Sequence, residues 1–185
     1  MRKFLLFVVI ASLMACRAST PPKKYISIPS LIENQIRHID TSLYSIKRIN
    51  SIDTLVQDSG FVRREDFREA VAAFLLIPDL SDPKQAKAFT EEIRYDDLLK
   101  RVIITYTPID AEKTPFQRME LFVEPNLATG DKVQTILVTR RKSDRNGFEQ
   151  QDLVWQMDRS CTRIERTRKP AEAEQATTFK LSWNE

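Results

Sequence analysis

The sequence is poor in the residues on which many catalytic and metal sites depend. Its 185 residues include one histidine, two cysteines and three glycines. A single histidine excludes a multi-histidine metal site, and two cysteines exclude a disulfide-dense scaffold. Three scattered glycines exclude a glycine-rich phosphate-binding loop. Nothing in the sequence therefore indicates a metal or a cofactor.

The charge balance is also small, with 29 basic against 26 acidic residues and a formal charge of +3. A nucleic-acid-binding domain usually carries a larger basic excess, and a disordered chain has less apolar content than the 42% found here. The composition predicts one globular domain that does not bind nucleic acid.

The first sixteen residues have the pattern of an export signal. Arg2 and Lys3 precede an apolar run from Phe4 to Ala11, which is too short to span a membrane as a helix. The segment Leu13-Met14-Ala15-Cys16 resembles the lipobox of bacterial lipoproteins. In that family the cysteine sulfur receives a diacylglyceryl group, and the chain is cut just before it. The alternatives are an ordinary signal peptide or an uncleaved apolar arm.

The lipobox resemblance implies a division of the chain into three parts. Residues 1–15 are the signal peptide, residues 16–28 are the lipidated Cys16 with a short polar tether, and residues 29–185 are a single domain. Two or three acyl chains, palmitate among them, hold a protein firmly on a membrane. Residues 17–19 lack the aspartate that retains many such lipoproteins at the inner membrane. By analogy we expect the outer membrane, with the domain facing the periplasm.

The first part of the domain has helical signals. Ser30 and Glu33 have capping-box spacing, which predicts a helix from about Leu31 to Asp40, and a hairpin of residues 43–49 and 53–57 follows. A second helix is predicted over residues 63–76 and a short one over residues 83–92.

The remainder of the chain is typical of strands separated by turn residues. Alternating apolar and polar residues predict six strands, at residues 101–106, 117–123, 132–141, 148–158, 162–167 and 177–183. Asn146-Gly147 favours a tight hairpin turn. Short connections predict an antiparallel meander, and the fold class is therefore α+β, with N-terminal helices packed on one face of a curved sheet.

This arrangement resembles that of uncharacterised envelope lipoproteins of the Bacteroidetes group. The resemblance rests on the lipobox, on the helix core from Glu69 to Phe74, on the turn from Pro78 to Pro83, and on the strands that follow. The family implies a fold and no known activity.

The residues that carry chemistry form no recognisable catalytic pattern. His38 lies on a predicted helix surface, and Cys161 is either a small buried residue or a free thiol. Acid pairs occur at Asp79 with Asp82, and at residues 91–92 and 96–97, where a solvated surface competes with glycoside hydrolysis or calcium binding. We therefore predict a protein that is not an enzyme.

Two groups of residues are candidates for binding. The first is a basic surface for anionic headgroups or an acidic envelope partner, which competes with simple protection of strand edges: Arg140, Arg141, Arg163, Arg166 and Arg168. The second lines either an apolar ligand cavity or an ordinary core: Trp155, Met157, Phe179, Leu181 and Trp183.

The sequence thus predicts a membrane-anchored envelope lipoprotein that acts as a non-catalytic binding or assembly module. The alternative is a carrier or sensor of an apolar ligand held between the sheet and the helices. A concave apolar pocket would favour the carrier, whereas a filled core with an exposed edge or apolar patch would favour a protein partner.

Overall fold

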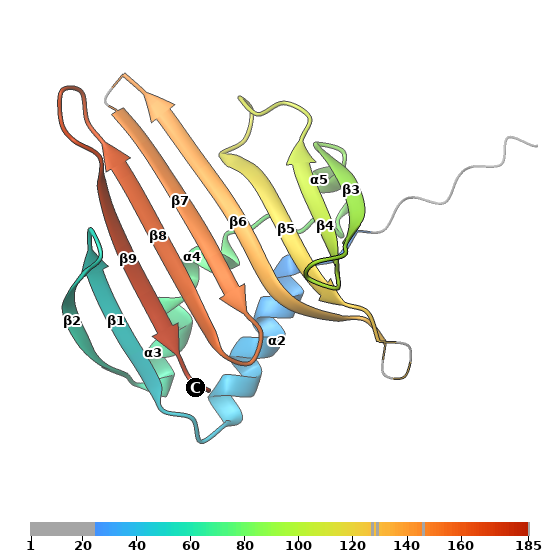
Figure 1. The fold of residues 1–185 in the computed structure, drawn as a ribbon, viewed down its shortest axis with the longest axis horizontal. Helices are drawn as coiled ribbons and strands as arrows, with labels where there is room; N and C mark the ends of the chain where they lie inside the picture. Colours follow the sequence, from blue (N-terminus) through green and yellow to red (C-terminus); the bar gives the residue numbers. More distant parts are fainter. Residues whose placement is uncertain (1–24, 127, 129, 146, 185) are drawn as a thin grey trace, which may run out of the picture.

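The computed structural model describes residues 25–126, 128, 130–145 and 147–184. The predicted signal peptide, Cys16, residues 17–24 and Asn146 of the predicted turn lie outside the described residues. The described chain is an α+β protein, in which short helices pack on one open antiparallel sheet (Figure 1). The sheet has nine strands, more than the six of the predicted meander.

The chain order of the strands is nearly their order in the sheet. The strands are β1 (Ile46–Ile52), β2 (Leu55–Val62), β3 (Phe89–Asp96), β4 (Arg101–Pro108), β5 (Phe116–Glu124), β6 (Lys132–Asp144), β7 (Gly147–Gln156), β8 (Ser160–Arg168) and β9 (Gln175–Ser182). Their order across the sheet is β2-β1-β9-β8-β7-β6-β5-β4-β3. The predicted meander is present as β4 to β9, and the N-terminal hairpin joins it by pairing β1 with β9.

The helices cover one face of this sheet, which we call the inner face and define by the side chains of Trp155 and Leu181. Helices α2 (Ile28–Thr41), α3 (Arg64–Ala70) and α4 (Ala72–Leu75) contribute buried residues to the same core. Phe67 and Phe74 of these helices contact Trp155 edge to face, with ring centroids 6.5 and 5.2 Å apart. Alternation along the strands places the predicted apolar residues on this face.

Helix α2 begins earlier than predicted. Its N-cap is Ser27, whose side-chain oxygen accepts a hydrogen bond from the backbone N–H of Ser30. The capping-box interpretation of Ser30 with Glu33 was therefore wrong. Pro29 is compatible with the first turn of a helix, because the backbone N–H that proline lacks has no partner there. Ile28, Ile32, Ile36 and Ile39 form the buried stripe of α2.

Two further helical predictions need correction. The helix predicted over residues 63–76 is divided at Val71, where φ is −102° and ψ is 11°. The helix predicted over residues 83–92 ends early, as α5 (Pro83–Ala86), and the chain continues into strand β3. In β3, Ile93 and Tyr95 alternate with charged residues at 92, 94 and 96, which is the pattern of an edge strand.

The N-terminal hairpin is present and longer than predicted. Its two-residue turn, Asp53-Thr54, has both residues at positive φ, 46° and 76°, which matches the twist of a hairpin. Between β1 and β2 the register shifts at Asn50 and Ser51. Among the helices of the described residues, none is both long and apolar enough to cross a membrane.

Candidate partner-binding surface

The inner face of the sheet changes from apolar to polar along the strands. One row across four paired strands consists of Ile136, Trp155, Cys161 and Leu181, which are all buried under the helices. The next row, Val138, Leu153, Arg163 and Phe179, is mixed. Beyond the helices, the upper ends of β6 to β9 have no covering layer among the residues that the structure describes (Figure 1). The sheet thus has an uncovered part.

We call this uncovered part the open strip and define it by two rows of residues. The first row is Arg140, Gln151, Glu165 and Thr177, and the second is Lys142, Glu149, Thr167 and Gln175. Members of the first row are half-buried and members of the second are exposed. The open strip is therefore a polar surface continuous with the apolar core.

Hydrogen bonds connect three side chains of the first row. Arg140 donates from Nη1 to Oε1 of Gln151 at 3.1 Å, and Gln151 donates from Nε2 to Oε1 of Glu165 at 2.8 Å. Arg163 lies at the inner margin, with its Nε 3.2 Å from the same oxygen of Glu165. These contacts order four side chains of the open strip and its margin.

Aromatic rings support two of these arginines. The guanidinium of Arg140 lies 5.1 Å from the ring centroid of Phe116, and that of Arg163 lies 5.2 Å from the ring centroid of Phe179. Both distances are typical of cation–π contacts. The Nε atoms of Arg140 and nearby Arg48 are buried without a hydrogen-bond partner among the described residues, and the Nε of Arg163 has its ion pair with Glu165 but no hydrogen bond. Arg163 and Phe179 also line a hollow of about 520 Å³ beside α3.

The structure divides the predicted basic surface between the two faces of the sheet. Arg140 and Arg163 lie on the inner face, whereas Arg141, Arg166 and Arg168 lie on the outer face, because neighbouring residues of a strand alternate. On the outer face Arg166 forms an ion pair with Asp152. The ring centroid of Phe148 lies 5.0 Å from the guanidinium carbon of Arg141 and 6.0 Å from that of Arg168. The five arginines are thus not brought together.

The residues predicted to line a cavity or a core lie in the core cluster or against it. Trp155, Met157, Leu181 and Trp183 are buried, and Phe179 is partly buried at its margin. The rings of Trp155 and Trp183 are 5.6 Å apart at their centroids, and Phe67 packs edge to face on both. Other buried side chains of the same core cluster surround them.

Other candidate residues have structural partners. Cys161 is buried, and burial raises the pKa of its thiol far above the ordinary value, which makes it unreactive. Asp79 accepts hydrogen bonds from Ser81, and Asp82 caps α5 through the N–H of Lys84. Exposed His38 lies edge to face with Tyr44. Within the part of the chain that the structure describes, no three potential metal ligands gather.

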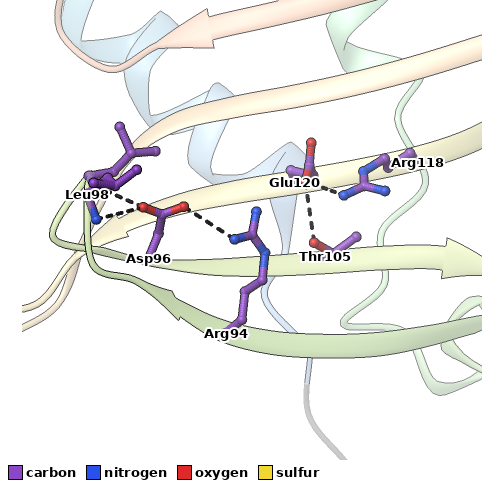
Figure 2. A network of polar contacts seen from close by, with 7 residues as sticks. Arg94, Asp96, Leu98, Thr105, Arg118 and Glu120 are labelled. Atoms are coloured by element: carbon purple, nitrogen blue, oxygen red, sulfur yellow. Dashed lines mark hydrogen bonds and ion pairs between the residues drawn. The ribbon is translucent and has the colours of Figure 1, made fainter.

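Polar contacts also organise the outer face near the far edge of the sheet. Glu120 accepts from Arg118 at 2.7 Å and lies 3.5 Å from the hydroxyl of Thr105, while Asp96 accepts from Arg94 at 3.3 Å (Figure 2). The backbone N–H of Leu98 donates to the same aspartate at 3.1 Å. These contacts hold the strands and the β3–β4 turn in place.

The sequence did not identify Gln151 and Glu165 of the open strip, or Arg48, which lines the hollow beside α3 with Arg163 and Phe179. A usable signal was present, since Gln151 lies two residues before Leu153 and four before Trp155 and so shares their face. The chain matches no model of a known protein family, no curated protein and no solved structure.

Proposed function

We propose that this chain is a lipid-anchored cell-envelope protein that binds an envelope partner through the open strip. Cys16 would hold it on the outer membrane, facing the periplasm, as the lipobox pattern suggests. In this role the domain is a binding or assembly module without catalysis.

The observation that carries the proposal is the contrast between the two halves of the inner face. Under the helices, buried side chains such as Trp155 and Phe67 pack against one another, which supports a protein partner over the carrying of an apolar ligand. The other half presents a hydrogen-bonded polar row that no helix covers. Ordered, amphipathic arginines beside aromatic rings are typical of binding interfaces.

Site-specific cross-linking in intact cells tests the partner. A photo-reactive residue at Glu149, in the open strip, should give a discrete cross-linked product. The same residue at Lys47, which is exposed on the outer face of β1, should not. In the variant that carries the photo-reactive residue at position 149, Arg140→Glu should lower the yield of the cross-linked product. Lys47→Glu in the same variant should leave the yield unchanged. Equal products from both positions would contradict the proposal.

The anchor is tested separately by labelling cells with a palmitate analogue. The wild-type chain should incorporate the label, and Cys16→Ala should lose it and accumulate with the uncut leader. Cys161→Ala is the matched control, because that cysteine is buried in the domain and should leave the labelling unchanged. Labelling that survives Cys16→Ala would remove the anchor from the proposal.

A further inference from the structure

The β3–β4 hairpin exposes four large apolar side chains. Leu98 at its turn is 95% exposed, and Leu99, Tyr95 and Ile93 are each more than half exposed. These residues are neighbours on one hairpin, so they form a group rather than scattered surface residues. A group of exposed apolar residues marks a surface that another apolar phase covers.

The turn is held in a fixed conformation. The carboxylate of Asp96 accepts hydrogen bonds from the backbone N–H groups of Leu98 and Leu99, at 3.1 and 2.9 Å (Figure 2). These bonds and the nearby Arg94 lower the pKa of Asp96. Lys100 closes the turn at a φ of 52°. The two leucines are thus presented by a formed turn, and they lie at the tip of the hairpin.

The described chain begins beside this hairpin. Tyr25 packs on Tyr106 of β4, with ring centroids 5.2 Å apart, and β4 is the partner strand of β3. Strand β4 begins at the turn with Arg101, and Tyr106 lies five residue steps, or about 17 Å, further along the strand. Eight residues lie between Cys16 and Tyr25, and the nine residue steps span at most about 30 Å. A lipid on Cys16 therefore keeps the hairpin within reach of the bilayer.

The chemistry of the hairpin suits a membrane interface. Tyrosine is enriched where hydrocarbon meets the headgroups, and Tyr95 lies three residues before Leu98 on the same hairpin. Residues 94–101 contain three bases, Arg94, Lys100 and Arg101, and two acids, Asp96 and Asp97. Basic side chains at that level contact anionic headgroups.

From this geometry we infer that the β3–β4 hairpin inserts Leu98 and Leu99 into the interface of the same membrane that holds the lipid anchor. The inference rests on the proposed anchoring at Cys16. It adds a second point of contact, and two contacts fix the orientation of a domain that a flexible tether alone would leave free. The edge strand β3 would then face the bilayer.

An environment-sensitive fluorophore at position 98 tests the inference. The full chain carrying Leu98→Cys is expressed with its own leader, purified from membranes in detergent, labelled with the fluorophore NBD and reconstituted into phosphatidylethanolamine and phosphatidylglycerol vesicles. Cys161 is buried and should escape labelling. The matched control is Val56→Cys on β2, at the opposite edge of the sheet, where the native side chain is 65% exposed.

We expect the emission at position 98 to shift to the blue in vesicles and to be quenched by nitroxide-labelled lipids, and the emission at position 56 to do neither. Vesicle-bound protein with an aqueous signal at position 98 would overturn the hairpin contact and leave the anchor intact. Protein that fails to float with the vesicles would defeat the anchor and the inference together. A blue shift at position 98 in detergent-free solution without vesicles would show that protein covers the tip, which also overturns the inference.

Discussion

At the scale of single residues, Trp155 is the centre of the packed interior. Its ring contacts those of Phe67, Phe74 and Trp183, which come from α3, α4 and the C-terminal end of the chain. It is completely buried. One side chain thus joins the sheet to two helices, and its indole Nε1 has no hydrogen-bond partner among the described residues.

Trp155→Ala should lower the free energy of unfolding by about 3–5 kcal/mol, because truncation of a buried tryptophan loses its packing and leaves a cavity. Urea denaturation followed by circular dichroism measures the change. Phe61→Ala, at a side chain that is 76% exposed, is the control and should change the value by less than about 0.5 kcal/mol. Similar losses from both substitutions would contradict the assignment of the core.

Tyr106 should make stability depend on alkaline pH. Burial raises the pKa of Tyr106 from 10.0 to about 12. The folded chain holds this proton more tightly than the unfolded chain, so the stabilisation is complete below about pH 10 and is lost as the pH rises toward 12. Tyr106→Phe should therefore flatten the fall in stability across this range.

Paired denaturation curves of wild type and Tyr106→Phe at increasing pH measure the difference. The substitution also removes the hydroxyl that accepts from the N–H of Ile26 at 3.3 Å, which lowers stability at every pH. The informative quantity is therefore the slope with pH. Identical slopes for the two proteins would count against a buried, neutral Tyr106.

At the scale of elements, Gln35 fastens α2 to the sheet. Its Nε2 donates to Oδ1 of Asp158 at 2.9 Å, and its Oε1 accepts from the backbone N–H of Asp158 at 2.8 Å. Asp158 lies in the β7–β8 turn at a φ of 59°. Glu33 and Arg68 connect α2 to α3 by an ion pair at 2.5 Å.

Gln35→Ala should lower the free energy of unfolding by about 1–3 kcal/mol, because the N–H of Asp158 loses its acceptor. Gln35→Glu keeps the acceptor and adds a second carboxylate beside Asp158. The decrease in the free energy of unfolding caused by Gln35→Glu should therefore be smaller at acidic pH. The decrease caused by Gln35→Ala should not depend on pH in this way. Thermal denaturation at neutral and acidic pH separates the two. A similar pH response in both variants would contradict the pairing.

The elements also show what local sequence patterns can predict. The strands of the meander were predicted because one face of each is buried, which produces clear alternation, as in Leu153 and Trp155. Strand β3 was missed because it lies at an exposed edge, where charged residues replace the clear apolar alternation of a buried strand. The same charged residues are also common in helices. The break at Val71 was missed because the helical spacing of Phe67 and Phe74 continues across it.

The binding surface was less predictable than the fold. The arginines could be named from the local sequence, but the face of the sheet on which each one lies depends on the strand register. A shift of one residue reverses every side chain, and Arg140 and Arg141 accordingly lie on opposite faces. The hydrogen-bonded row of Arg140, Gln151 and Glu165 comes from three strands and exists only after they pair.

At the scale of the whole molecule, the sheet has two unequal edges. Half of the residues of β3 are charged, whereas β2 has a single charged residue, Asp58, and exposes Leu55, Val56 and Phe61. Charges protect an edge strand against pairing with other chains. The edge at β2 lacks most of this protection.

Amide hydrogen exchange should reveal this inequality. Strand β7 pairs on both sides and lies under the helices, so its amides near Trp155 should exchange most slowly. Strand β2 pairs on one side only and is mostly exposed, so its amides should exchange faster. Mass spectrometry of peptides after timed exchange measures both. Equal protection of β2 and β7 in a dilute sample would contradict this ranking of the strands.

The pairing of β1 with β9 has a consequence for the order in which the molecule forms. Lys47 near the beginning of the domain pairs with Ser182 near its end, so the N-terminal hairpin has no place in the sheet until the last strand has been made. Contacts between such distant positions slow folding, because a long loop must close first. A chain in which β9 has not yet formed keeps the edges of β1 and β8 unpaired. The nine-stranded sheet is therefore complete only after β9 has joined it.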